Sequence, residues 1–270
     1  MADPSHASDD RATVAERAAR AGGERAIETF RTDVPAETKT GKTDLVTRAD
    51  RDTQETIVET IERTFPDDPI VGEEGDELKN VPESGPAWVI DPIDGTNNYV
   101  RGTRLWATSV AATMDGEPVA AANVVPALGD AYLADGERAR RNGAELSVSD
   151  RSDPKAAIVA LTAWAGSRRP AVYTDLWGEL VDRFGDTRRY GSAQATLSYV
   201  ASGGLEAVVT NTDPNPWDTL AGACLIRRAG GRVTNLDGDR WQGTGGFVAS
   251  NGEGEIHESA LEAAQVIRED

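Results

Sequence analysis

The spacing of apolar and polar positions changes character about halfway along the chain. Residues 11–30 carry Ala and Val at helical spacing around Gly22-Gly23, and 49–65 form a second helical segment that Pro66 ends. Short apolar runs separated by turn residues follow. They predict antiparallel strands at 107–114, 118–125 and 130–134. Leu45-Val46-Thr47 predicts a shorter strand after a polar loop at 35–44.

Past Asn142-Gly143, strand and helix patterns alternate. Strands are predicted at 156–161, 187–190, 205–210, 232–234 and 246–249, and helices at 172–184, 192–202, 217–229 and 255–268. This order predicts an α/β (α+β) fold in two halves. We expect a disordered acidic tail at 1–10, an N-terminal α+β half at 11–145 with most candidate metal ligands, and a C-terminal α/β half at 146–270.

The net charge of the chain limits the classes of molecule that it can bind. Acidic residues outnumber basic ones 46 to 28, which gives a net charge of -18. Such a field repels nucleic acid and anionic membranes, so we expect neither as a partner. Only four of the basic residues are lysines, a composition typical of proteins adapted to molar salt.

The chain start lacks an apolar signal segment, and no apolar run reaches the roughly 18 to 20 residues of a membrane span. We therefore expect a cytoplasmic protein. The single cysteine, Cys224, excludes an intramolecular disulfide and reads as a core thiol. His6 and His257 lie far from every motif, and we expect both to be solvated.

The segment W-V-I-D-P-I-D-G-T at 88–96 carries the clearest chemical pattern. An apolar strand ends at Asp91, Asp94 follows three residues later, and Gly95-Thr96 opens a helix whose amides can face an anion. Two carboxylates beside an anion repel it unless hard cations intervene, and Mg²⁺ suits oxygen ligands. Alone, the segment also fits an acidic turn.

Further acidic residues lie at the ends of two other predicted elements. Glu73 and Glu74 follow the apolar pair Ile70-Val71, and Asp218 precedes an apolar helix. Taken singly, the glutamates fit a solvated turn and Asp218 fits a helix N-cap. The interpretation of each therefore depends on the others.

Together, G-E-E at 72–74, D-P-I-D-G-T at 91–96 and P-W-D at 216–218 resemble the inositol monophosphatase family in order and spacing. These are Mg²⁺-dependent, lithium-sensitive phosphomonoesterases that include archaeal fructose-1,6-bisphosphatases. The resemblance covers about residues 11–268 and includes Gly191-Ser192-Ala193 and 217–231. It implies a layered αβαβα sandwich of the sugar-phosphatase type, two or three Mg²⁺ ions and a homodimer.

The resemblance also assigns roles to residues. The implied metal ligands are Glu73, Asp91, the carbonyl of Ile93, Asp94 and Asp218. The pair that positions and deprotonates the attacking water is implied to be Asp50 and Thr96, and the amides of Gly95 and Thr96 are implied to hold the phosphate. The implied substrate contacts are Asn211, Ser192 and Ala193, with Lys39 or Lys42 in a loop that closes over a third metal site.

The substrate stays open because Asn211 departs from the family pattern. Inositol-preferring members carry an acidic residue there, seven positions before the W-D aspartate, and Asp213 offers a replacement only in a different register. We expect a small phosphate monoester such as inositol-1-phosphate as substrate. The alternatives are fructose-1,6-bisphosphate, histidinol phosphate and adenosine 3′,5′-bisphosphate. A catalytically silent cation-binding regulatory protein would be expected to lack part of the metal set, which is complete here.

Overall fold

The computed structural model describes residues 4–32, 36–38, 45–162 and 170–265. The α-helices are α1 (Pro4–Thr29), α2 (Arg48–Glu62), α3 (Thr96–Val100), α4 (Pro170–Arg183), α5 (Ala193–Ala201), α6 (Leu220–Arg228) and α7 (Gly254–Gln265). Two 3₁₀ turns are η1 (Pro154–Ala156) and η2 (Pro216–Asp218). None of the described helices combines the length and apolar character that a membrane crossing requires.

The strands form one large sheet, one smaller sheet and a two-stranded ribbon. The ribbon pairs β1 (Ala36–Thr38) with β2 (Leu45–Thr47). The large sheet contains β3 (Ile70–Gly72), β4 (Pro86–Asp94), β5 (Ala107–Met114), β6 (Glu117–Val125), β7 (Asp130–Ala134), β8 (Ala139–Arg141) and β9 (Ala144–Glu145). The smaller sheet contains β10 (Ile158–Leu161), β11 (Asp186–Arg188), β12 (Ala207–Thr210), β13 (Arg232–Asn235) and β14 (Phe247–Ser250).

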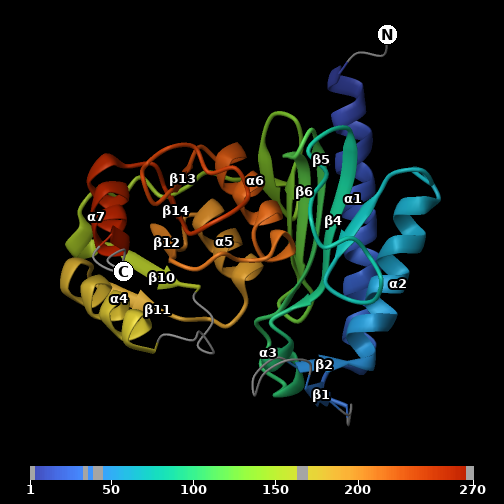
Figure 1. Ribbon diagram of the computed structural model, residues 1–270, viewed down its shortest axis with the longest axis horizontal. Coiled ribbons are helices and arrows are strands. Elements are labelled where there is room, and N and C mark those ends of the chain that lie inside the picture. The colour runs from blue at the N-terminus through green and yellow to red at the C-terminus, as the bar shows by residue number, and fades with distance from the viewer. Residues whose placement is uncertain (1–3, 33–35, 39–44, 163–169, 266–270) are drawn as a thin grey trace.

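The elements stack in five layers, as Figure 1 shows. Helices α1 and α2 cover the outer face of the large sheet, and α5 and α6 lie between the two sheets. Helices α4 and α7 cover the outer face of the smaller sheet. Each sheet therefore has both faces covered, which explains the nearly continuous burial of its central strands, such as β4, β5 and β12. The predicted αβαβα sandwich is confirmed.

The two sheets draw their strands from separate parts of the chain. The large sheet runs in sequence order from β3 to β9, antiparallel except for the β3–β4 pair. The smaller sheet has the order β11-β10-β12-β14-β13. Its strands all follow residue 146, whereas those of the large sheet all precede it. A site between the layers must therefore combine residues distant in sequence.

The glycine pair in α1 allows close helix packing. A Cβ on Gly22 would lie 2.6 Å from Cγ1 of Ile57, and one on Gly23 would lie 2.9 Å from Cγ of Pro126. These distances are shorter than a side chain tolerates, so the two glycines let α1 approach α2 and the large sheet. The helix stays continuous through them because this tertiary packing offsets the low helix propensity of glycine.

Three predicted boundaries are wrong. Helix α1 begins at Pro4, so residues 4–10 are helical rather than a disordered tail; proline suits a first helical turn because its missing N–H has no helical acceptor there. Residues 36–38, predicted as loop, form β1 because they pair with β2. The predicted helix at 217–229 divides into η2 and α6, where Thr219 leaves the helical conformation.

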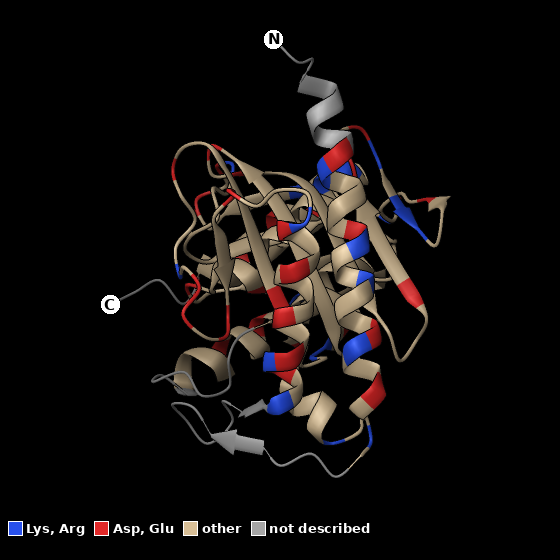
Figure 2. Cartoon of the chain, turned by 90° about the vertical axis from the view of Figure 1, so that its right-hand side faces the viewer, with Lys and Arg blue, Asp and Glu red and all other residues tan. Residues whose placement is uncertain are grey.

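Charged residues of both signs alternate along the outer face of α1 and α2 (Figure 2). Arg25 bonds the carboxylates of Glu28 and Asp52 at 2.7 and 2.6 Å, and Arg20 bonds Glu16 at 2.7 Å. Arg20 and Arg25 on this face therefore have carboxylate partners.

Cys224 and His257, which have no assigned role, differ in how well the structure matches their predictions. Cys224 is buried, and burial raises the pKa of its thiol to about 11, which confirms a core thiol. The prediction of a solvated His257 is wrong. Its ring is fully buried between the hydroxyls of Thr234 and Ser250, at 2.9 Å from Nε2 and 2.7 Å from Nδ1. Burial, with the nearby Arg232, lowers the pKa of His257 to about 4.

The His257 imidazole makes unfolding depend on pH. Its pKa lies near 6.5 when exposed and about 4 in the fold, so the unfolded chain binds more protons between these values. We expect the free energy of unfolding to fall as the pH drops through this window. In the His257→Gln variant, this contribution to the pH dependence of the free energy of unfolding should be absent. Urea unfolding of both proteins between about pH 7 and pH 4 measures it, and parallel curves would contradict a neutral buried His257.

Candidate active site

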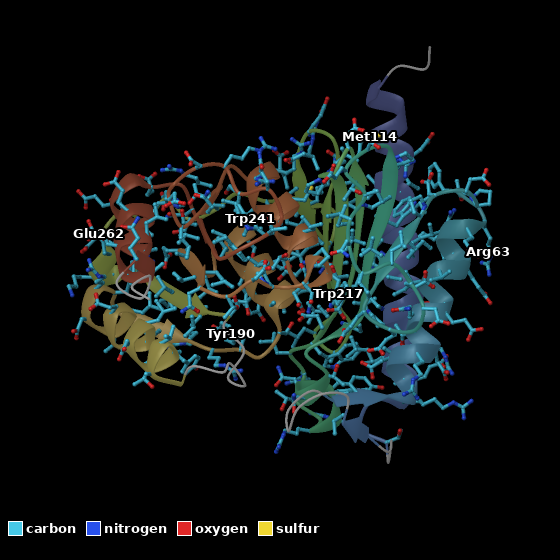
Figure 3. All side chains as sticks on the ribbon, viewed as in Figure 1. Arg63, Met114, Tyr190, Trp217, Trp241 and Glu262 are labelled. Carbon is cyan, nitrogen blue, oxygen red and sulfur yellow. The ribbon has the colours of Figure 1, made fainter. Side chains whose placement is uncertain are left out.

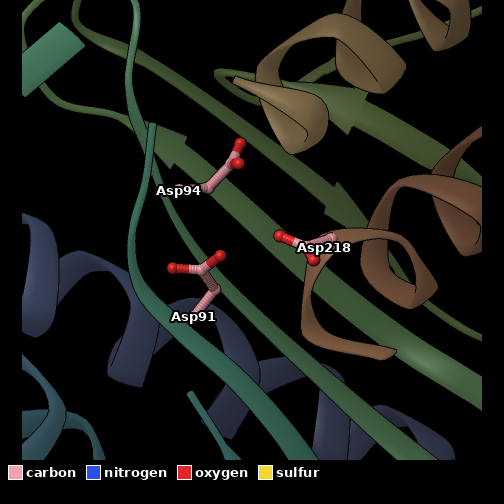
Figure 4. Close-up of side chains that lie close together, drawn as sticks. All are labelled: Asp91, Asp94 and Asp218. Carbon is pink, nitrogen blue, oxygen red and sulfur yellow. The ribbon is translucent and has the colours of Figure 1, made fainter. Parts of the chain in front are cut away.

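Three aspartates meet where the large sheet faces η2 and the start of α6. Asp91 and Asp94 come from the end of β4, and Asp218 comes from η2 (Figure 4). One carboxylate oxygen of each lies within 4.8 Å of one from both others. Their exposed fractions are only 1%, 5% and 8%. The fold thus gathers three acidic groups in a place that water reaches poorly.

A bulge in β4 brings the first two aspartates together. Residues three apart in a regular strand point to opposite faces of a sheet. Here the pairing with β5 shifts between Asp91 and Asp94, where Pro92 has no N–H to donate. The Thr108 hydroxyl donates to the freed carbonyl of Pro92 at 2.9 Å. The shift therefore lets both carboxylates face the same side.

The Asp91 carboxylate has the least support from protein groups. Both of its oxygens are buried and have no hydrogen-bond partner among the described residues. Burial, followed by the nearby carboxylates of Glu73, Asp94 and Asp218, raises the pKa of Asp91 well above its usual value. A buried carboxylate without donors fits a position that a cation would stabilise.

Asp94 is held by the N-terminus of α5. Its carboxylate accepts hydrogen bonds from the Ser192 hydroxyl, from the amide of Ala193 at 3.0 Å and from the amide of Gln194 at 2.7 Å. Burial raises the pKa of Asp94, while these donors act in the opposite direction. Ser192 and Ala193, predicted to contact substrate, thus face Asp94, and their role toward substrate stays a prediction.

Asp218 has a single side-chain donor among the described residues. Asn215 Nδ2 donates to its Oδ2 at 3.1 Å. Burial raises the pKa of Asp218 well above its usual value, and the charges of Asp94 and Glu73 add to this. The three aspartates therefore destabilise each other's charged form, as like charges at this separation do.

Glu73 lies in a loop whose backbone is fixed from two sides. Gln54 on α2 donates to the carbonyl of Glu74 at 2.7 Å and accepts from its amide at 2.9 Å. Lys79 Nζ donates to the carbonyl of Gly72 at 2.7 Å and lies 5.7 Å from the ring centre of Trp217, next to Asp218. Both contacts were missed at the sequence level because they join residues with no shared motif.

The predicted catalytic pair is in contact. The Thr96 hydroxyl lies 3.1 Å from Oδ1 of Asp50 and 3.2 Å from the carbonyl of Ile93, and it can donate to either. Asp50 is fully buried in the first turn of α2, whereas Thr96 begins α3 and is partly exposed. A buried carboxylate joined to a more accessible hydroxyl is a suitable arrangement for moving a proton.

Gly95 makes the turn into α3 possible. Its φ is +94°, a conformation that other residues rarely adopt, and a Cβ would lie 2.9 Å from the carbonyl oxygen of Gly191. Asn98 then donates to the carbonyl of Tyr190 at 2.8 Å and joins α3 to the same segment. The Gly95-Thr96 turn therefore sits against the residues that lead into α5.

Gln194 joins the supports of two aspartates. Besides its amide bond to Asp94, its side chain donates to the carbonyl of Trp217 at 2.6 Å and accepts from the amide of Gly222 at 2.8 Å. It is fully buried, and Asn123 on β6 donates to its Oε1 at 3.0 Å. This role could not be predicted from the sequence, because a glutamine in a helix is ordinarily exposed.

The predicted substrate loop is only partly engaged with the protein. Asn211 directly follows β12 and is partly buried. Asp213 accepts a hydrogen bond from the amide of Gly245 at 2.6 Å, so its carboxylate supports a neighbouring loop. Lys39 and Lys42 lie outside the described residues.

The arrangement fits a hard divalent cation. Asp91, Asp94 and Asp218 supply carboxylate oxygens, and the unpaired oxygens of Asp91 lack any other partner among the described groups. A cation among them would offset the burial and the nearby negative charges that raise the pKa values of Asp91 and Asp218. The donor set contains no sulfur or imidazole, which favours Mg²⁺ over a softer metal.

Residues 8–269 match the inositol monophosphatase family. The Nus factor SuhB of Escherichia coli is 32% identical over 242 residues, which cover 88% of this chain and 90% of that protein. A protein named fructose-1,6-bisphosphatase/inositol-1-monophosphatase in Thermotoga maritima is 35% identical over 241 residues, 87% of this chain and 88% of that one.

Solved structures of inositol monophosphatases also align with this chain. An inositol monophosphatase from Thermotoga maritima aligns with a TM-score of 0.85 at 30% identity, over 96% of this chain and 98% of that one. An IMPase/NADP phosphatase solved with Mg²⁺ and phosphate aligns with a TM-score of 0.77 at 25% identity, over 89% of each chain. The layers and the order of elements are therefore those of known structures.

Neutralising Asp91 should stabilise the metal-free protein. Asp91→Asn removes one of three buried like charges, so its melting temperature in EDTA should exceed that of the parent by a few degrees, at about 2 to 4 °C per kcal/mol for a chain of this size. Addition of Mg²⁺ should raise the melting temperature of the parent and leave that of the variant nearly unchanged. Differential scanning calorimetry measures both.

Asp135→Asn is the matched control. Although partial burial acts to raise the pKa of Asp135, the amides of Arg138 and Glu137 and the Arg140 guanidinium lower it. Its loss should therefore lower the melting temperature and preserve the response to Mg²⁺. A destabilised Asp91→Asn protein that still responds to Mg²⁺ would contradict the metal assignment.

Proposed function

The chain belongs to the inositol monophosphatase family, and we propose that this phosphatase hydrolyses small sugar and polyol phosphates with Mg²⁺. We propose inositol-1-phosphate as a representative substrate of this class, and fructose-1,6-bisphosphate as the nearest alternative substrate. The observation that carries the proposal is the cluster of Asp91, Asp94 and Asp218, in which both Asp91 oxygens are buried and accept no hydrogen bond from the residues that the structure describes.

The proposed metal ligands are Glu73, Asp91, Asp94, Asp218 and the carbonyl of Ile93. The carboxylate cluster supports the three aspartates, and the charge of Glu73, which acts to raise the pKa of Asp91 and of Asp218, places that residue near them. A structural relative of 25% identity solved with Mg²⁺ and phosphate is consistent with the set, and the Ile93 carbonyl is included from the family resemblance. When bound, Mg²⁺ supplies charge neutralisation for a phosphate dianion and lowers the pKa of water. Two or three ions are proposed, in line with the family resemblance.

Asp50 and Thr96 are proposed to handle the proton of the attacking water. The Thr96 hydroxyl is within hydrogen-bond distance of the Asp50 carboxylate, so it can receive a proton from water as it passes its own proton to Asp50. Asp50 is buried, and this keeps the carboxylate aimed at Thr96 rather than at solvent. No covalent nucleophile is needed, and Cys224 is buried elsewhere in the core.

Gly95 and Thr96 are proposed to hold the phosphate through their amides. Support comes from the tight Gly95 turn, which places the start of α3 beside the aspartates. Ser192 and Ala193 are proposed to lie at the substrate's edge, where they also orient Asp94.

Asn211 is proposed to permit a broad choice of substrate. A carboxylate would accept charge-assisted bonds from two ring hydroxyls, whereas an amide offers one acceptor and a neutral dipole. Asp213 is a weak substitute because it already accepts the Gly245 amide. A relative named for both fructose-1,6-bisphosphatase and inositol-1-monophosphatase activities is consistent with such breadth.

A cytoplasmic homodimer adapted to high salt completes the proposal. The net charge of -18 and the shortage of lysine support the salt adaptation. The non-enzymatic alternative, a silent cation-binding regulator, is disfavoured because the carboxylates and the Thr96–Asp50 contact are all present. The name Nus factor describes the Escherichia coli relative, and we do not extend it to this chain.

The function is tested by phosphate release at high KCl from inositol-1-phosphate, fructose-1,6-bisphosphate, histidinol phosphate and adenosine 3′,5′-bisphosphate. We expect Mg²⁺-dependent release from the first two. Thr96→Val should lower kcat by about a hundredfold or more, the usual size of a proton-transfer contribution. It should keep the stabilisation by Mg²⁺, since the aspartates are unchanged.

Thr60→Val provides the matched control. Thr60 on α2 donates to the carbonyl of Thr56 at 2.8 Å and belongs to no proposed site. Its kcat should stay within about threefold of the parent, a change below 1 kcal/mol. A parent that hydrolyses none of the four substrates would overturn the function, and an active Thr96→Val protein would overturn the role of Thr96.

Asn211→Glu should shift the substrate preference toward inositol-1-phosphate. The new carboxylate would bind ring hydroxyls and repel the second phosphate of fructose-1,6-bisphosphate. We expect the ratio of the two kcat/KM values to rise about tenfold, equivalent to about 1.4 kcal/mol. Steady-state kinetics of both proteins measure it. An unchanged ratio would mean that Asn211 does not face the substrate.

A further inference from the structure

A cleft lies at the C-terminal end of α6, and none of the three clustered aspartates lines it. Its volume is about 460 Å³. The ten described residues that line it include Arg227, Arg228, Arg232 and Arg240, and none of them is acidic. We call this cleft, with its four arginines, the arginine cleft. In a chain with 46 acidic and 28 basic residues, a lining without any carboxylate is unexpected.

The four arginines converge from three segments. Arg227 and Arg228 end α6, Arg232 begins β13, and Arg240 follows the turn after β13. Cations at the end of a helix stabilise its dipole, which accounts for the first two. It does not account for Arg232 and Arg240, which come from other elements and line the same space.

Backbone carbonyls hold three of these guanidinium groups. Arg227 donates to the carbonyl of Trp241, Arg228 to that of Asp135 at 3.1 Å, and Arg232 to that of Gly238 at 3.4 Å. A carbonyl orients a guanidinium but leaves its charge in place. On the α1 and α2 face, by contrast, Arg20 and Arg25 have carboxylate partners.

One carboxylate reaches the group from the rim. Glu117 lies 2.7 Å from Arg240 and 3.7 Å from Arg227. No ion pair of Arg228 or Arg232 is seen within the described part of the chain. Burial and the Arg240 charge lower the pKa of Arg227. The cleft therefore keeps a positive excess that an anion would relieve.

The cleft is separate from the catalytic carboxylates. Asp218 lies just before the start of α6, and Arg227 and Arg228 lie at its end, about 13 Å along the helix. Figure 3 labels Trp217, next to Asp218, and Trp241, whose carbonyl accepts from Arg227, at different places between the layers.

We propose that the arginine cleft binds a small phosphorylated anion as a second ligand, at a site distinct from the carboxylate cluster. Guanidinium groups match phosphate oxygens in geometry and form paired, charge-assisted hydrogen bonds. A cleft of this volume has room for a molecule of the size of a sugar phosphate or a nucleotide. The proposal does not depend on the substrate of the catalytic site.

The test is calorimetric titration of the full chain with inorganic pyrophosphate in EDTA, at a KCl concentration where circular dichroism shows the protein folded. Without divalent cations, the three buried aspartates repel an anion, so binding reports on the arginine cleft. We expect one site per chain. Arg228→Gln combined with Arg232→Gln should weaken binding at least about tenfold, because two charge-assisted contacts are lost.

Arg20→Gln combined with Arg63→Gln is the matched control, with the same change in net charge on the α1 and α2 face. It should leave the affinity within about twofold of the parent, as exposed pairs contribute little. If the double variant has a lower melting temperature than the parent, Arg232→Gln alone is titrated in its place. Absence of pyrophosphate binding, or equal affinity in the cleft and control variants, would overturn the proposal.

Discussion

Mutual repulsion among three buried carboxylates is the constraint on which the rest of the structure depends. Asp91, Asp94 and Asp218 lie within 4.8 Å of one another where water reaches poorly, and burial raises the pKa of each. A fold does not hold such a cluster for stability alone, because neutral side chains would pack at lower cost. The cation that we propose at this site would offset the repulsion and so explain why the cluster is kept.

The surrounding elements act against that repulsion. The first turn of α5 supplies donors to Asp94, and Gln194 extends this support to the segment that carries Asp218. Gln54 fixes the backbone beside Glu73 from α2. Helices on both sides of the large sheet thus contribute to one site, and the layered fold brings these distant segments together.

The acidic residues of the site could be predicted because they lie in short local motifs next to strands and helices, as with Asp91 and Asp94. The bulge that turns both to one side could not, since it depends on pairing with β5. The same holds for Gln194 and for the buried His257, whose partners are far away in sequence. The arginine cleft also escaped prediction, because its residues scatter among ordinary charged positions.

The most direct test of the account is anomalous diffraction from a crystal soaked in Mn²⁺, which substitutes for Mg²⁺ at oxygen sites. We expect anomalous density among the carboxylates of Asp91, Asp94 and Asp218, with the Asp91 oxygens among the ligands of the Mn²⁺ ion. A fully occupied Mn²⁺ site elsewhere, with no density between these three aspartates, would contradict it.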